Sequence, residues 1–169
     1  MEMQNYLFDL LEKAGEKHGM KLVGARAQNW LRQEKSYRAF GNELGRDATP
    51  LEADLPRFVD LNKEFFGKDK LEETGVRVKC CTLLIDGPAD ADPWGHEALY
   101  AEDGTRVGRL TSGGYSVAFE KSIGMGYVKP EQAVEGTKLK VKMQDKLWDA
   151  VVTCDSPYDP KNETIRKDG

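Results

Sequence analysis

Histidine and cysteine are scarce in this sequence, whose 169 residues include two histidines and three cysteines. His18 and His96 lie far apart, and neither has a cysteine at the spacing that zinc ligands require. Cys80 and Cys81 are adjacent, which would strain a disulfide between them, and Cys154 makes the count odd. We therefore expect reduced thiols, no metal site and a cytoplasmic protein. A redox role is the alternative, but no Cys-x-x-Cys motif supports it.

Long apolar runs and basic clusters are also missing from the sequence. No segment approaches the roughly 20 apolar residues that span a bilayer, and the opening Met-Glu-Met-Gln shows no secretion signal. Residues 1–75 hold 12 Lys/Arg against 14 Asp/Glu, and residues 76–169 hold 13 against 15. Nucleic-acid binding requires a concentrated basic surface. We therefore expect neither a membrane span nor a nucleic-acid partner.

Helical periodicity is the main signal in the first part of the chain. Apolar residues recur every three or four positions over residues 3–14, which predicts an amphipathic helix that ends near Gly19. A second helix is expected over residues 25–31. Its buried side should consist of Ala27, Trp30 and Leu31.

Two further helices are predicted by their boundary residues. Thr49 can cap a helix, Pro50 suits its first position, and Glu52 can complete a capping box. A last short helix is expected over residues 68–74, where Gly75 stops it.

The pattern changes at Gly75, after which short segments with strand character alternate with turn signals. The expected strands cover residues 76–85, 96–101, 105–110, 122–128, 137–143 and 147–154. The expected turns lie at residues 86–88, 102–104, 112–114, 135–136 and 144–145. Such strands indicate a closed barrel or a sandwich, and we expect an antiparallel barrel of about six strands. A helix of three or more turns after residue 76 would contradict this.

Two glycine-containing segments have a partial likeness to catalytic motifs. Residues 103–108 lack the Lys-Ser/Thr ending of a phosphate loop, so a hairpin turn is the better interpretation. Residues 111–115 lack the Gly-x-Ser-x-Gly of a nucleophile elbow, and a tight bend in a barrel is expected there.

The charged segment over residues 31–38 leaves two interpretations open. It follows the second helix, and exposed ion pairs at a helix end would each contribute little to stability. In the other interpretation, one carboxylate turns inward and meets a ligand.

Several segments follow one another in an order that is found in a known family. They are residues 24–27, 31–35, 41–44, 49–53, 58–59, 63–67, 104–115, 123–128, 136–137 and 158–160. Together they resemble the folate-binding aminomethyltransferase family, which includes the T-protein of glycine cleavage and the C-terminal regions of dimethylglycine and sarcosine dehydrogenases. The Arg-x-Glu-Lys-x-Tyr at residues 32–37 and the Tyr-Asp-Pro at residues 158–160 are more similar to the dehydrogenase branch than to the T-protein.

The resemblance implies an α+β fold. Residues 1–75 would form the second half of the folate-binding domain, and residues 76–169 a C-terminal antiparallel β-barrel domain. The implied function is the C-terminal part of a tetrahydrofolate-dependent one-carbon-transfer enzyme that acts on N-methyl or aminomethyl donors. The acidic catalytic residue of the family would lie upstream of Met1, so this chain alone is expected to be inactive. The alternative is a non-catalytic structural or subunit-assembly module.

The resemblance also implies two ligand contacts. Glu34 matches the glutamate that binds pterin, whose aminopyrimidine edge offers two parallel N–H donors to a carboxylate. Lys63 matches a basic position that would meet the carboxylates of the folate tail, or it is simply exposed. Gln33 stands where the family usually has leucine. Tetrahydrofolate would be shared with the missing N-terminal half or another subunit, and FAD would belong only to an upstream domain, because no Gly-x-Gly-x-x-Gly begins this sequence.

Overall fold

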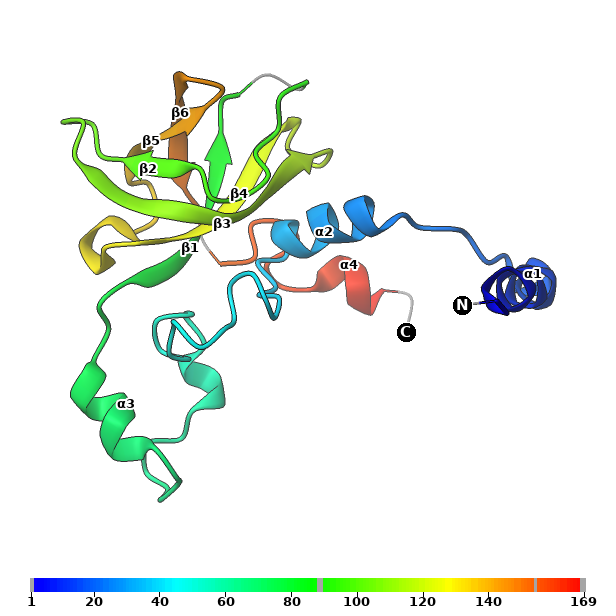
Figure 1. Cartoon of the computed structure of the whole chain (residues 1–169), viewed down its shortest axis with the longest axis horizontal. Helices are drawn as coiled ribbons and strands as arrows, with labels where there is room; N and C mark the ends of the chain where they lie inside the picture. The colour runs from blue at the N-terminus through cyan, green and yellow to red at the C-terminus, as the bar shows by residue number, and fades with distance from the viewer. Residues whose placement is uncertain (1, 88–89, 154, 168–169) are drawn as a thin grey trace.

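The structure is a computed structural model that describes residues 2–87, 90–153 and 155–167. Its helices are α1 (Gln4–Gly15), η1 (Glu16–His18), α2 (Ala25–Glu34), η2 (Pro56–Phe58), α3 (Lys68–Thr74), η3 (Pro130–Gln132) and α4 (Glu163–Arg166). Its strands are β1 (Lys79–Ile85), β2 (Ala98–Tyr100), β3 (Arg106–Ser116), β4 (Lys121–Val128), β5 (Lys138–Met143) and β6 (Lys146–Val152). The strands close into an antiparallel barrel in the order β1-β4-β3-β2-β5-β6 (Figure 1). The expected six-stranded barrel is therefore confirmed.

The barrel encloses an apolar core, because alternate residues of each strand point inward. Leu83 and Ile85 of β1, Leu110 of β3 and Val141 of β5 are all fully buried. The other members of this core are Cys81, Leu99, Val107, Val128, Leu139, Met143, Ala150 and Val152. Full burial of one large aliphatic side chain contributes about 1.5–3 kcal/mol to folding. The barrel is thus a firm support for the segments that pack on its outside.

The hairpin turn expected over residues 103–108 is confirmed. Gly104 has a φ of +83°, and the Thr105 N–H donates to Asp103 Oδ1 at 2.8 Å. The hairpin between β5 and β6 turns at Gln144 and Asp145, whose φ angles are +47° and +60°. Two consecutive residues with positive φ match the twist of antiparallel strands.

The turn expected at residues 112–114 is wrong, because β3 runs on through these residues to Ser116, with a register irregularity in its pairing with β4 between Leu110 and Ser112. Added Cβ atoms would overlap the backbone of Pro93 at Gly113 and the indole ring of Trp30 at Gly114. The glycines therefore allow close approach of neighbouring segments to the strand, rather than a turn. The chain reverses instead over residues 117–120, between β3 and β4.

The first predicted helix forms, but none of the described residues covers its apolar stripe. Figure 1 shows α1 well apart from the barrel, at the end of an extended segment that leads to α2. The helix continues through η1 and stops at Gly19, which has a φ of +68°. Its exposed apolar side chains are Met3, Tyr6, Leu7, Phe8, Leu10 and Leu11.

The second helix, α2, is longer than predicted and presents a different face to the barrel. It extends to Glu34, and Leu31 is 57% exposed, so the prediction that Leu31 is buried is wrong. Gln33 and Glu34 are buried instead, and Trp30 contacts β3 at Gly114. Positions 30, 33 and 34 share one helix face. Because two of these three residues are polar, hydrophobic periodicity did not identify the buried face.

The capping box at Thr49 is present, but no helix follows it. The Thr49 N–H donates to Glu52 Oε2 at 2.8 Å, and the Glu52 N–H donates to Thr49 Oγ1 at 3.1 Å. One turn then ends at Asp54, whose φ is +59°. The Glu52 carboxylate is also bound by the Arg77 side chain at 2.8 Å, which ties this turn to the segment that enters β1. The short helix α3, which ends at Gly75, is as predicted.

Two of the three cysteines can be placed. Cys80 and Cys81 are free and buried in β1, and burial raises the pKa of each thiol to about 12. Cys154 lies outside the described residues. Within the described ranges, no group of three or more His, Cys, Asp or Glu side chains could hold a metal ion. No helix among them has the length and apolar character that a membrane crossing demands.

Candidate functional site

Glu34 is the last residue of α2, and its carboxylate turns inward toward the barrel. Its exposed fraction is 5%. The Ser116 hydroxyl donates to Glu34 Oε1 at 2.5 Å, and the Ala118 N–H approaches the same oxygen at 3.5 Å. Of the two interpretations of segment 31–38, the structure therefore shows the inward carboxylate.

The second oxygen of this carboxylate has no partner in the described part of the chain. The hydrogen bonds to the Glu34 side chain all reach Oε1, whereas Oε2 receives none from the described residues. The neighbouring Gln33 donates its amide to Asn29 O at 3.1 Å and to Gly113 O at 3.2 Å. This orientation leaves the buried Gln33 Oε1 without a donor among the described residues. Gln33 is fully buried, so the unused acceptor that a ligand edge with N–H donors could reach is Glu34 Oε2.

The C-terminal segment is anchored beside Glu34. The Tyr158 N–H donates to the Glu34 carbonyl oxygen at 3.0 Å. The buried Lys35 ammonium donates to the carbonyl oxygens of Tyr158 and Asp159 at 3.2 and 2.7 Å, and to Asn162 Oδ1 at 2.7 Å. Sequence reasoning assigned no role to Lys35. The charged segment after α2 therefore holds the Tyr-Asp-Pro motif in place, and with it the surroundings of Glu34.

Lys63, the other candidate, lies elsewhere on the surface. Its side chain is 78% exposed, and Nζ is 3.7 Å from Asp60 Oδ2. Within the described residues, no hydrogen bond or ion pair joins Lys63 to Glu34. The structure therefore does not bring the two candidates into direct contact.

Glu43 is a buried carboxylate that sequence reasoning missed. It accepts hydrogen bonds from Arg32 Nη1 at 2.8 Å, from the Ala39 N–H at 2.9 Å, and from the hydroxyls of Thr111 and Ser112 at 2.7 and 2.5 Å. Charge-assisted bonds of this kind are each worth about 1.5–3 kcal/mol. Glu43 therefore fixes α2 and the segment around it to β3. Only the Gly-Asn-Glu-Leu match at residues 41–44 pointed to this segment, and it carried no sign of the role.

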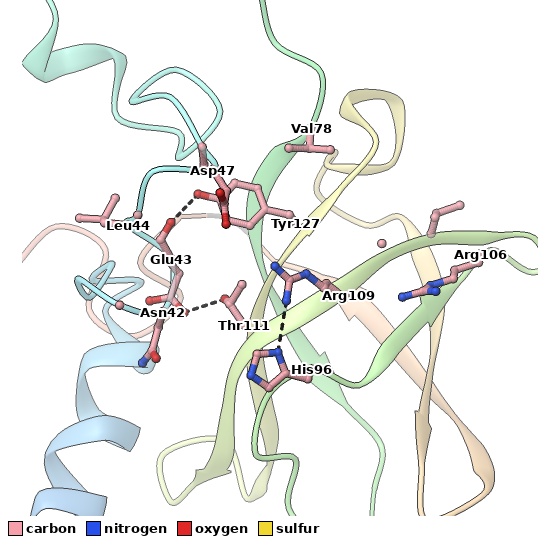
Figure 2. A pocket seen from close by; sticks show the side chains of 15 residues that line it. Asn42, Glu43, Leu44, Asp47, Val78, His96, Arg106, Arg109, Thr111 and Tyr127 are labelled. Atoms are coloured by element: carbon pink, nitrogen blue, oxygen red, sulfur yellow. Dashed lines mark hydrogen bonds between the residues drawn. The ribbon is translucent and has the colours of Figure 1, made fainter.

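A cavity of about 520 Å³ lies between residues 41–48 and the outer face of β3 (Figure 2). Arg106, Arg109, His96 and Tyr127 line its barrel side. The Tyr127 hydroxyl donates to the Glu43 carbonyl oxygen at 2.7 Å, and burial raises the pKa of this hydroxyl above its usual range. The hydrogen bond of Tyr127 therefore holds one side of the cavity in place, and Arg106 and Arg109 give its barrel side positive charge.

Comparison with known proteins gives the context of these features. The family model of the glycine cleavage T-protein C-terminal barrel domain matches residues 79–159, and that of the GCVT N-terminal domain matches residues 1–63. Mitochondrial dimethylglycine dehydrogenase of Homo sapiens is 38% identical over 153 residues, which are 86% of this chain and 17% of that protein. An aminomethyltransferase of Natranaerobius thermophilus is 38% identical over 152 residues, which are 86% of this chain and 40% of that protein.

A solved structure agrees with these sequence matches. The crystal structure of glycine cleavage system aminomethyltransferase T from Bartonella henselae superposes with a TM-score of 0.79 at 26% identity. The match covers 90% of this chain and 44% of that chain. This chain therefore spans less than half the length of each of these three relatives.

Proposed function

Because this chain belongs to the glycine cleavage T-protein family, we propose that it is the C-terminal part of a tetrahydrofolate-dependent one-carbon-transfer enzyme. The donor would be an N-methyl or aminomethyl compound, as for an aminomethyltransferase or a dimethylglycine or sarcosine dehydrogenase. Residues 1–75 would form the second half of the folate-binding domain and residues 76–169 the C-terminal barrel domain. The donor, and any flavin, would be bound by other parts of a longer protein. A cytoplasmic location belongs to the same proposal.

The carboxylate of Glu34 is the observation that carries this proposal. It is buried, it is held by Ser116 through one oxygen, and its other oxygen has no donor among the described residues. Tetrahydrofolate supplies the carrier for the one-carbon unit, and this chain's part would be to bind and orient its pterin. A carboxylate accepts two parallel N–H donors, whereas a side-chain amide offers one acceptor oxygen and one donor NH₂ group. Orientation of this kind lowers the barrier to transfer between bound reactants.

Lys63 would take a second, weaker part in the same function. Its ammonium is exposed, and its pairing with Asp60 at 3.7 Å is loose. Exposed ion pairs contribute about 1 kcal/mol or less, so the ammonium is free to exchange Asp60 for another carboxylate. We propose that it meets the carboxylates of the folate tail.

The exposed face of α1 supports a partner for the first 75 residues. An isolated helix of 12 residues is marginal in water, and α1 has many exposed apolar side chains. A contiguous apolar surface of this kind marks an interaction site. We infer that the N-terminal half of a folate-binding domain covers α1, either in the same polypeptide or in another subunit.

Tetrahydrofolate binding tests the function. The full-length product of the gene that encodes this chain is titrated calorimetrically with tetrahydrofolate under anaerobic conditions. One folate should bind per protein, and the 169-residue chain alone should bind at least 30-fold more weakly. The chain alone should also show no turnover with dimethylglycine or sarcosine when flavin is supplied. A folded full-length protein that binds no folate would refute the proposal.

A non-catalytic assembly module is the second candidate, and the apolar surface of α1 favours it equally. In that case the barrel and α2 would serve as a docking platform, and Glu34 would be a structural residue. Full-length protein that assembles with a partner through α1 but binds no folate would support this second function.

A further inference from the structure

We propose that the cavity between residues 41–48 and β3 binds a small organic acid, whose carboxylate is held by Arg106 and Arg109. The cavity does not include Glu34, so this site is separate from the proposed folate contact and does not depend on it.

A β-bulge places the two arginines on the same face of β3. Residues three positions apart in a regular strand point to opposite faces of the sheet. Arg109 pairs with Ala98 of β2, and Arg106 pairs with Tyr100, but the register shifts by one residue between them. The extra residue in β3 is Val107, which is buried in the core. The bulge thereby turns both arginines outward, into the cavity that they line.

Arg106 and Arg109 have no ion pair among the described residues, and the same holds for Arg46, Arg57 and Arg166. By contrast, four arginines each pair with an aspartate or glutamate, and these are Arg26, Arg32, Arg38 and Arg77. Both guanidinium groups line the cavity without an ion-pair partner in the described part of the chain, so an anionic ligand in the cavity would be attracted to them.

His96 adds a third donor to the same wall. Arg109 Nη1 lies 3.2 Å from His96 Nδ1, and Figure 2 shows the two side chains directed toward each other. A guanidinium can only donate, so Nδ1 must accept and Nε2 of the neutral ring carries the proton. The backbone at His96 has a φ of +73°, an uncommon conformation for a non-glycine residue. Its amide donates to the Leu110 carbonyl oxygen at 2.9 Å, which holds the ring beside Arg109.

The acidic residues of the cavity do not neutralise this wall. The carboxylate of Glu43 is already bonded to Arg32, Thr111 and Ser112. Asp47 is the other lining carboxylate, and its single negative charge is outnumbered by the two positive charges of the lining arginines. A net positive charge therefore faces the cavity, which favours an anionic ligand.

The size and remaining walls of the cavity favour an organic acid over an inorganic anion. Its volume of about 520 Å³ lies within the range of sites for small molecules, about 300–1,000 Å³. Leu44, Val78 and the Tyr127 ring supply apolar or aromatic surface opposite and beside the arginines. A flat or apolar body would contact these walls, while its carboxylate would accept the forked donors of a guanidinium.

Isophthalate, a dicarboxylate with an aromatic body, is a direct probe. Calorimetric titration of the 169-residue chain should give saturable binding with a Kd of about 1 mM or tighter, which corresponds to about 4.1 kcal/mol. Arg109→Gln and Arg106→Gln should each weaken binding by about tenfold, and the double variant should bind no isophthalate at that concentration. Both side chains are exposed and lack carboxylate partners, so the melting temperature should not change.

Three controls decide between the alternatives. Arg166→Gln removes the same charge from α4, outside the cavity, and should leave binding unchanged. Inorganic phosphate should bind at least tenfold more weakly, because it cannot use the apolar walls. Amide chemical shifts should move at Gly108, Thr111 and Tyr127, which line the cavity. The proposal is overturned if binding does not saturate at 10 mM isophthalate, or if the double variant binds isophthalate as well as the wild type does. It is also overturned if phosphate binds as tightly as isophthalate, or if a hexaglutamate peptide, which carries many carboxylates, binds more tightly than isophthalate.

Discussion

Replacement of Glu34 by glutamine separates a ligand-binding role from a structural one. The change keeps the size of the side chain but removes its charge and one of its two acceptor oxygens. If Oε2 receives a pterin N–H, the variant loses one charge-assisted bond and presents an NH₂ group to a donor. Loss of one partner in a desolvated charged pair costs about 2–5 kcal/mol. Tetrahydrofolate affinity in the full-length enzyme should therefore fall by roughly 30-fold or more, at 1.4 kcal/mol per decade.

The effect of Glu34→Gln on stability should be small, for a reason visible in the structure. The Ser116 hydroxyl, now 2.5 Å from Glu34 Oε1, can donate equally well to an amide oxygen. The bond then changes from a charged one, worth about 1.5–3 kcal/mol, to a neutral one, worth about 0.5–1.5 kcal/mol. The free energy of unfolding should fall by about 1 kcal/mol, which lowers the melting temperature by about 2–4 °C for a protein of this size.

Ser116→Ala is the matched control, because it removes the structural partner of Glu34 and keeps the carboxylate. It should lower the free energy of unfolding by about 1–3 kcal/mol, since a buried charged acceptor loses its donor. Folate affinity should stay within about threefold of wild type. Affinity is measured by calorimetry and stability by urea denaturation on the same preparations. If Glu34→Gln reduces stability as much as Ser116→Ala and leaves folate affinity intact, Glu34 is a structural residue and the reasoning is refuted.

Three further predictions concern the barrel and the segments that enter it. Gly114→Ala should reduce the free energy of unfolding by about 1–3 kcal/mol in urea denaturation, because its Cβ would overlap the Trp30 ring; an unchanged value would mean that α2 does not pack there. The hydrogen bond from Arg77 lowers the pKa of Glu52 to about 2, below the value near 4.3 in the unfolded chain. The free energy of unfolding should therefore fall as the pH is lowered from 5 to 2, and the Arg77→Gln variant should show a shallower fall. The thiol pKa values of Cys80 and Cys81 are raised to about 12, so both should resist iodoacetamide at pH 7.5 in the native protein. Both should react in 6 M guanidinium, as monitored by mass spectrometry. Rapid labelling of the native protein would show that β1 opens.

Local sequence patterns predicted the elements whose structure depends on local interactions. The change from helical to alternating periodicity at Gly75 predicted the barrel, and the glycine itself predicted the end of α3. The turn at Gly104 followed from its Asp-Gly-Thr sequence, because positive φ and a local aspartate bond are properties of those residues.

Features that depend on contacts between distant segments were not predictable in the same way. The Ser-Gly-Gly sequence at 112–114 predicts a turn, but glycine serves both turns and close packing, and only the positions of Pro93 and Trp30 decide between them. The turn at Thr49 carries a correct capping box, yet it ends after a single turn at Asp54, whose φ is positive. Leu31 is exposed because the buried face of α2 is polar.

In the candidate site, too, some residues were indicated by the sequence and others depend on contacts between distant segments. Family resemblance indicated Glu34, and the structure places its carboxylate inside, beside Ser116. The Glu43 network could not be foreseen, because its side-chain partners lie 11 to 69 residues away in the sequence. The bulge at Val107, which turns Arg106 and Arg109 to one side, is likewise a property of strand pairing that no local pattern encodes.

A crystal structure of the full-length protein with tetrahydrofolate would show whether Glu34 binds the pterin through Oε2. Pterin N–H donors should lie within about 2.7–3.2 Å of Glu34 Oε2, while Ser116 still donates to Oε1. Pterin density at another place, with Glu34 bonded to Ser116 alone, would show that Glu34 does not bind the pterin.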